Sequence, residues 1–320
     1  MDTLGPMSND NTTATGGTVP DRSAIGTEKR NPRTMDLHTQ SVAELVQTIN
    51  REDRDVALAL KRAGARLTRF IEAAEAGFVA GGRLVYVGAG TSGRLGVLDA
   101  SEAPPTFQVD AGRVVGIIAG GDGALRKSSE GAEDDPRGAW DALRELNLNE
   151  RDAVIAIAAG ATTPYAIGAL EFCKTQIEAG SRPLTCMLTC AKVEAPEHAD
   201  HMVVLNTGPE VIAGSTRMKA GTATKLALNT ISTTLMVRAG RVYQNLMVDL
   251  KASNAKLRDR AARIVGTLTG VPRDEALKLL EACDGEVKVA VVAKRLGISA
   301  GAAREALARN QMRLDRVLEG

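Results

Sequence analysis

The fold of this chain is decided by the stretch Leu84-Val85-Tyr86-Val87-Gly88-Ala89-Gly90-Thr91-Ser92-Gly93. Its four leading apolar residues show no polar alternation and end in glycines, which is typical of a strand buried on both faces of a parallel sheet. Similar short apolar runs follow at 114–119, 154–158, 184–188 and 202–205. Helical patterns lie between most of these runs. Strands that alternate with helices predict a doubly wound α/β domain around a five-stranded parallel sheet.

Helical periodicity frames this domain. Apolar residues at spacings of three and four predict a helix that ends near 81–82; they are Leu60, Ala63, Leu67, Phe70, Ile71, Ala74 and Phe78. Another long helix is expected over 219–237. We therefore place an N-terminal helical arm at 27–54, the α/β domain at 55–240, a linker helix at 241–261 and a helical bundle at 262–320. Within the bundle the expected helices are 272–283, 286–296 and 299–318. Residues 1–26 have almost no large apolar residues and are predicted to be a disordered tail.

Composition excludes several classes of protein. The chain has 320 residues, 44% of them hydrophobic and 25% charged, with a net charge of +1, so no overall field favours nucleic acid or an anionic membrane. No apolar run reaches the roughly 20 residues of a membrane helix, and the N-terminus lacks a secretory apolar region, so we expect a cytoplasmic protein. Three scattered histidines do not predict a metal site. The four cysteines form no CxxC pair and are expected to be buried apolar residues: Cys173, Cys186, Cys190 and Cys283.

The turn after the first strand has the form GxGxxG over 88–93, which is formally a dinucleotide fingerprint. Its variable positions include Thr91 and Ser92, whose hydroxyls would add donors to the backbone N–H groups of a helix N-terminus. The dinucleotide pattern also needs an acidic residue at the end of the second strand, where this chain has Ala-Gly-Gly at 119–121. The turn therefore favours a terminal phosphate over a nicotinamide cofactor or a glycine turn without ligand. The expected phosphate-binding residues are Gly90, Thr91, Ser92 and Gly93.

A comparable loop follows the third strand and reads AGATTPY at 159–165. Small residues and hydroxyls again precede a helix, with Pro164 at the expected first helical position. Threonine is also a common helix cap, so this loop alone is ambiguous. Ligands of open α/β sheets bind at the carboxyl ends of the strands near the switch point, so both loops would converge on one phosphate. We therefore add Thr162 and Thr163 to the predicted phosphate site.

Two acidic clusters are further candidates. In the first, at 99–105, Glu102 precedes an Ala-Pro-Pro turn that would restrain its backbone. In the second, at 130–135, Glu130 and Glu133 are three residues apart and would share a helix face. Spacing alone favours a solvated surface for both clusters.

Several stretches resemble the N-acetylmuramic acid 6-phosphate (MurNAc 6-phosphate) etherases, which have the sugar isomerase (SIS) fold. The most specific stretch is LVYVGAGTSGRLGVLDASEAPPTF at 84–107. The others are TEKRNP at 27–32, EGAED at 130–134, GPEVIAGSTRMKAGTATK at 208–225 and NLMVDLKA at 245–252. The resemblance runs from about residue 27 into the C-terminal helices. It implies an SIS-type sheet followed by a small, ubiquitin-associated-like helical bundle.

The resemblance also implies a reaction. The family cleaves the D-lactyl ether of MurNAc 6-phosphate to N-acetylglucosamine 6-phosphate and D-lactate, in the recycling of cell-wall amino sugars. A base must take the C2 proton beside the open-chain aldehyde, an acid must protonate the departing lactyl oxygen, and water then adds to C3. Two carboxyls in opposite protonation states can do this without metal or cofactor. By resemblance, Glu102 and Glu133 match the two catalytic glutamates, with the division between acid and base left open. The family also implies a homodimer.

Other residues follow from the same resemblance. The stretch 208–225 supplies further substrate-site candidates, namely Glu210, Ser215, Arg217 and Lys219. The third-strand loop departs from the usual Ala-Ser-Gly pattern, because Gly160 and Ala161 stand in place of the serine and the glycine. The missing hydroxyl would cost about 1 kcal/mol or more of phosphate binding, unless Thr162 replaces it. A second departure is Ala191, where the family often has asparagine.

The C-terminal segment supports a function of another class. VAKRLGIS at 292–299, followed by REAL at 304–307, resembles a DNA-binding helix-turn-helix, and bacterial regulators join such a motif to an SIS domain. Those regulators usually carry it before the SIS domain. Residues 272–320 also hold nine Lys/Arg and eight Asp/Glu, whereas a DNA reader presents a basic face. The alternative, a sugar-phosphate-sensing regulator without catalysis, is therefore less favoured. The expected partner is a small sugar phosphate rather than nucleic acid or membrane.

Overall fold

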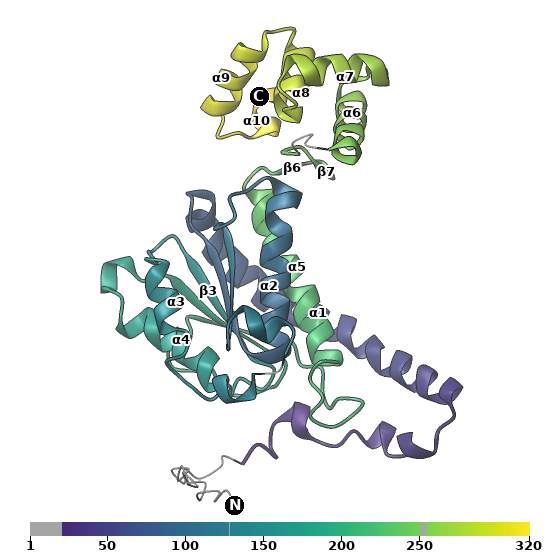
Figure 1. Ribbon diagram of the computed structural model, residues 1–320, viewed down its shortest axis with the longest axis vertical. Helices are drawn as coiled ribbons and strands as arrows, with labels where there is room; N and C mark the ends of the chain where they lie inside the picture. The colour runs from purple at the N-terminus through teal and green to yellow at the C-terminus, as the bar shows by residue number, and fades with distance from the viewer. Residues whose placement is uncertain (1–20, 128, 251–253) are drawn as a thin grey trace, which may run out of the picture.

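The computed structural model describes residues 21–127, 129–250 and 254–320 (Figure 1). An α/β domain occupies the middle of the long axis, with the C-terminal helices at one end and the N-terminal segment at the other. Within the described ranges, no helix is long and apolar enough to cross a membrane. Most of the predicted disordered tail lies outside these ranges. Its last part, 21–26, differs from the prediction, because the Ile25 side chain is buried.

Five parallel strands form the central sheet in the order β2-β1-β3-β4-β5. They are β1 (Leu84–Gly88), β2 (Val114–Ile118), β3 (Ala153–Ile157), β4 (Leu184–Thr189) and β5 (His201–Val204). Each of the five apolar runs in the sequence therefore forms a strand, as predicted. Every residue of β1 and β3 is buried, as expected for strands covered on both faces. The chain order reverses between β1 and β3, so their carboxyl ends flank the switch point.

Helices cover both faces of the sheet (Figure 1). One layer consists of α1 (Val42–Val79), α2 (Gly90–Phe107) and α5 (Lys219–Arg238), and the other of α3 (Trp140–Glu145) and α4 (Pro164–Thr175). Phe70 and Leu228 belong to the core of the first layer, and Leu143 and Phe172 to that of the second. The predicted doubly wound fold is confirmed. All four cysteines are buried, also as predicted, and burial raises the pKa of the Cys173 thiol to about 12.

Helix α1 begins at Val42, well before the apolar face that starts at Leu60. Ser41 and Glu44 form a capping box at its start: the Ser41 hydroxyl accepts from the Glu44 N–H, and the Glu44 carboxylate accepts from the Ser41 N–H. The buried residues of its first turns, Thr48 and Glu52, are polar, so apolar periodicity did not reveal this half. The helix runs through residues 54 and 55 without a break. The division between arm and α/β domain there stays a prediction.

The region after α5 differs from the expected linker helix. A two-stranded hairpin comes first, and α6 begins only at Ala255. The last predicted helix also divides, because Gln311 and Met312 have φ of 56° and 58°. The elements are β6 (Val242–Tyr243), β7 (Leu246–Met247), α6 (Ala255–Thr269), α7 (Arg273–Ala282), α8 (Val287–Leu296), α9 (Ala300–Arg309) and α10 (Leu314–Leu318). They share one core with the hairpin, so a separate helical C-terminal region is present as expected.

Short 3₁₀ helices complete the described chain: η1 (Gly26–Glu28), η2 (Pro32–Thr34), η3 (Leu37–Thr39), η4 (Asp122–Leu125), η5 (Glu130–Ala132) and η6 (Ala179–Ser181).

Candidate active site

The turn between β1 and α2 places Thr91 and Ser92, both partly exposed, in the first turn of α2. Only glycine fits at position 93, because a Cβ there would clash with the Gly88 carbonyl oxygen at 2.6 Å. Gly90 has φ of +52°, a conformation that glycine adopts at little cost. Within the described chain, no side chain caps this helix. The N–H groups of its first turn have no side-chain partner there, and the phosphate site at this turn stays a prediction.

The loop after β3 is built around a contact that the sequence did not reveal. Thr163 is the N-cap residue of α4, with Pro164 at the first helical position as predicted. The Thr163 hydroxyl donates to Glu133 Oε1 at 3.1 Å, and the Tyr165 N–H donates to the Glu133 carbonyl at 3.1 Å. A carboxylate at a helix N-terminus is also favoured by the helix dipole. The structure thus joins Glu133 to the third-strand loop, and the hydroxyl hydrogen of Thr163 is already used in the bond to that carboxylate.

The second acidic cluster is not a helix face. Its helical part is the single turn η5, which ends at Ala132, so Glu133 lies just beyond it. The backbone contact between Glu133 and Tyr165, rather than helical spacing, therefore fixes where this glutamate lies.

Glu102 occupies a different part of the domain. It lies within α2, and the expected Ala-Pro-Pro turn is the last turn of this helix. Pro104 and Pro105 lack the N–H groups that would bond to preceding carbonyls, yet the helix continues to Phe107. Ten residues separate Glu102 from Ser92, which corresponds to about 15 Å along a helix. The Glu102 side chain is exposed and bonds to no described residue, so no hydrogen bond within one chain joins it to the phosphate loop.

A half-buried carboxyl lies one turn before Glu102. Asp99 Oδ2 accepts from the Tyr86 hydroxyl at 2.8 Å, and its Oδ1 accepts from Ser232 at 3.2 Å. Burial raises the pKa of Asp99, and these hydrogen bonds oppose the rise. The three side chains tie α2 to β1 and α5 and thereby fix the helix that carries Glu102.

Two of the further candidates are buried at the start of α5. The Glu210 carboxylate accepts from the Lys219 and Ala220 N–H groups, each at 2.9 Å, and so caps the helix. Burial raises the pKa of Glu210. Lys219 Nζ donates to Glu52 Oε2 at 3.1 Å, and the side chains of Lys219 and Glu52 are both 0% exposed. The structure thus assigns Glu210 and Lys219 to the interior and not to an open site.

The other two candidates lie on the adjoining loop, where Ser215 is partly exposed and Arg217 is exposed. The N-terminal arm docks on this loop: the Thr34 hydroxyl donates to the Val211 carbonyl at 2.8 Å, and the Gly214 N–H donates to the Thr27 carbonyl at 3.1 Å. The α5 start also reaches the first loop, because a Cβ on Gly221 would lie 3.3 Å from Thr91 Cγ2. The TEKRNP segment is therefore joined to the loop that leads into α5.

Comparisons with known proteins place the chain in a family. The N-terminal SIS domain model of glucokinase regulatory protein matches residues 66–174. N-acetylmuramic acid 6-phosphate etherases of Salmonella agona (strain SL483) and Salmonella typhi are each 49% identical over 294 residues, which cover 91% of this chain and 97% of the relative. The chain belongs to the N-acetylmuramic acid 6-phosphate etherase family. Among solved structures, the E. coli CFT073 protein c3406 aligns with 62% of this chain and 93% of its own, at 14% identity and a TM-score of 0.44.

In the third-strand loop, this chain departs from the Ala-Ser-Gly pattern that is usual in the etherase family. Ala161, where glycine is usual, has φ of +54° and is buried, so a side chain occupies a backbone conformation that favours glycine. At Gly160 a Cβ would have ordinary contacts, 3.4 Å to Thr162 Oγ1 and 3.5 Å to Ile25. The usual serine would therefore fit at 160, and Ile25, which precedes the N-terminal arm, lies against this point.

Proposed function

We propose that this chain cleaves the D-lactyl ether of MurNAc 6-phosphate in the cytoplasm, giving N-acetylglucosamine 6-phosphate and D-lactate. The observation that carries the proposal is 49% identity to etherases over 91% of the chain. The contact between Glu133 and the third-strand loop supports it, because this contact sets a carboxylate beside a loop suited to a phosphate.

The phosphate is bound by the first loop. The Gly90 N–H and the hydroxyls of Thr91 and Ser92 lie at an uncapped helix start, which attracts a dianion. Gly93 allows the close backbone approach in this turn, and its own N–H donates to the Ala89 carbonyl at 3.1 Å. Thr162, one residue before the cap of α4, supplies a hydroxyl from the third loop. Thr163 has a different role, because its hydroxyl already donates to Glu133. It positions the carboxylate.

The chemistry is an elimination followed by an addition. One carboxylate takes the C2 proton of the open-chain sugar, the C3–O bond breaks, and a carboxylic acid protonates the lactyl oxygen as its electron pair leaves. Water then adds its oxygen to C3 and a proton returns to C2. We assign the two carboxyls to Glu133 and Glu102.

The separation of Glu102 from the phosphate loop supports a site shared between two copies of the chain. Within one chain Glu102 lies about 15 Å along α2 from Ser92, so its backbone is well separated from a phosphate held at Ser92. In a homodimer, the exposed Glu102 of one protomer enters the site formed by the loops of its partner. Each site then needs both protomers.

Release of D-lactate from MurNAc 6-phosphate tests the activity, and failure to release it would overturn the proposal.

Mixing two inactive variants tests the shared site. Glu133→Gln and Glu102→Gln, refolded together, form heterodimers in which one of the two sites is intact. If the copies mix at random, activity returns to about a quarter of wild type. A mixture as inactive as its parents would contradict the shared site and leave the reaction itself untouched.

A further inference from the structure

A cavity of about 620 Å³ lies where the α/β domain meets the C-terminal region. Its walls come from the C-terminal ends of α1 and α5, from the residues just before β2 and β6, from the segment between α9 and α10, and from α10. Contact between the two regions fixes this place: Arg313 Nη1 donates to the Arg238 carbonyl at 2.8 Å, and a Cβ on Gly240 would lie 2.9 Å from Arg313 Cγ. Five arginines line the cavity: Arg113, Arg238, Arg241, Arg313 and Arg316.

The positive charge of this lining is only partly neutralised. The two carboxylates in the lining are Glu72 and Glu75, against five guanidinium groups. Arg238 pairs with Glu75 at 2.7 Å, while Arg241 and Arg313 pair with carboxylates outside the lining. Among the described residues, Arg113 and Arg316 have no carboxylate within 4.0 Å. Arg316 donates to the neutral Gln311 amide at 2.7 Å.

Arg113, which is half-buried in the cavity lining, also shows this excess of positive charge. Its guanidinium lies 4.3 Å from the centroid of the Phe78 ring and donates to the Phe78 carbonyl. Its Nε is buried and has no hydrogen-bond partner in the described chain. Burial lowers the pKa of Arg113, and the nearby charge of Arg241 lowers it further. A negatively charged ligand would favour the charged form of Arg113 and so oppose this lowering of its pKa.

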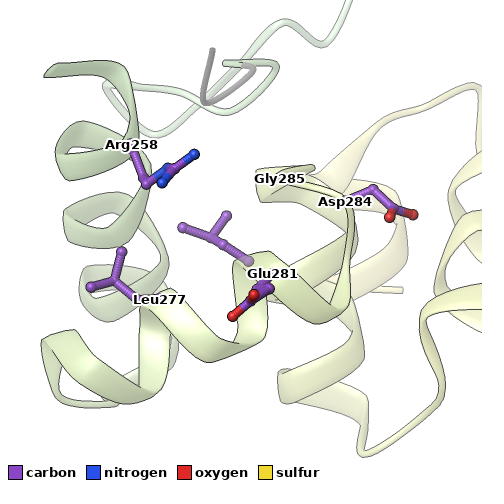
Figure 2. A pocket seen from close by; sticks show the side chains of 6 residues that line it. Arg258, Leu277, Glu281, Asp284 and Gly285 are labelled. Atoms are coloured by element: carbon purple, nitrogen blue, oxygen red, sulfur yellow. The ribbon is translucent and has the colours of Figure 1, made fainter. Parts of the chain in front are cut away.

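A cavity within the C-terminal region provides a contrast (Figure 2). It measures about 450 Å³ and is lined by Arg258 together with two acidic residues, Glu281 and Asp284. Leu277 and Leu280 supply its apolar wall. Acidic side chains outnumber the single arginine there, so this cavity, unlike the junction cavity, carries no surplus of donors suited to an anion.

We propose that the junction cavity binds a phosphate-bearing small molecule that has no aromatic ring. Its volume lies within the range of small-molecule sites, and guanidinium groups bind phosphate oxygens in pairs. None of its lining residues is aromatic, so it offers no platform on which a nucleobase would stack. A bound anion bridges Arg113 of the α/β domain and Arg316 of the C-terminal region. This site is separate from the substrate site and does not depend on the proposed reaction.

Calorimetric titration with inorganic pyrophosphate tests the site. The Ser92→Ala full-length chain serves as the background, because it weakens phosphate binding at the first loop. We expect saturable pyrophosphate binding in this background. Adding Arg316→Gln should weaken it about tenfold, since a charge-assisted hydrogen bond is lost. Adding Glu72→Gln should tighten it severalfold, since a repelling carboxylate is removed.

The matched control is Arg144→Gln, an exposed arginine on α3 that does not line the cavity. It should leave the pyrophosphate affinity unchanged. Absence of saturable binding would overturn the proposal. Equal affinities of the Arg316→Gln and Glu72→Gln chains would also overturn it. These substitutions change the charge of the cavity lining in opposite directions, so equal affinities would mean that pyrophosphate binds elsewhere.

Discussion

The loops after β1 and β3 hold equivalent positions at the switch point, but they are built differently. Glycines close the first loop, and in the described chain the hydroxyls of Thr91 and Ser92 bond to no protein atom. The third loop is held by side chains, with Thr163 bonded to Glu133. We therefore propose that the first loop, whose hydroxyls are left available, binds the phosphate, and that the third loop, which uses one hydroxyl on a carboxylate, positions Glu133.

The largest effect is expected from the carboxylate itself. Glu133→Gln removes a proton carrier while its amide oxygen can still accept from Thr163, so the fold should be kept. We expect turnover to fall by about 10²- to 10⁴-fold, measured as D-lactate release, with an unchanged circular dichroism spectrum. Turnover near that of wild type would return Glu133 to a structural role.

The first loop should respond in binding rather than turnover. Ser92→Ala removes one hydrogen bond to a charged phosphate, so KM should rise about tenfold while kcat falls less. Steady-state kinetics with MurNAc 6-phosphate measures this. MurNAc without its phosphate should be a poor substrate of the wild-type chain, and equal turnover of the two sugars would remove the phosphate role of this loop.

Thr163 and Thr162 give a sharper test of the contrast between positioning a carboxylate and binding phosphate. Thr163→Ala leaves Glu133 without its side-chain donor, so kcat should fall about five- to tenfold with little change in KM. Thr163→Ser keeps the hydroxyl and should restore kcat. Thr162→Ala is the matched neighbour and should raise KM instead. If Thr163→Ala changed only KM, both loops would be phosphate binders.

The smallest effect concerns the backbone of the third loop. Ala161→Gly relieves a left-handed conformation, so we expect stability to rise by about 1 kcal/mol or less, since glycine also loses more chain entropy. Thermal unfolding measures it. The control Ala159→Gly, at a position without positive φ, should lower stability. Destabilisation by both changes would show that the Ala161 conformation carries no strain.

Much of this architecture could be predicted from the sequence. Apolar runs without alternation marked all five strands, and hydroxyl-bearing turns after β1 and β3 were expected to meet because parallel strands end at one edge of the sheet. These signals are local, and each lies within a few neighbouring residues.

The features that were missed depend on contacts between distant parts of the chain. Glu133 and Thr163 are 30 residues apart, and Lys219 and Glu52 are 167 apart. Nothing in their local spacing reveals such pairs. The family resemblance made Lys219 a substrate-site candidate, and a lysine is rarely buried, yet its pairing with Glu52 accounts for its burial. The extension of α1 was hidden for a related reason, since the buried residues of its first turns, Thr48 and Glu52, are polar.

The fate of isotopes in the products tests the central claim most directly. Turnover of MurNAc 6-phosphate in deuterated, oxygen-18 water distinguishes elimination and addition from displacement at the lactyl carbon. The account predicts N-acetylglucosamine 6-phosphate with deuterium at C2 and heavy oxygen at C3, together with unlabelled lactate oxygen at the former ether position. Heavy oxygen in the lactate, with no exchange at C2, would contradict the mechanism and the roles of Glu102 and Glu133 together.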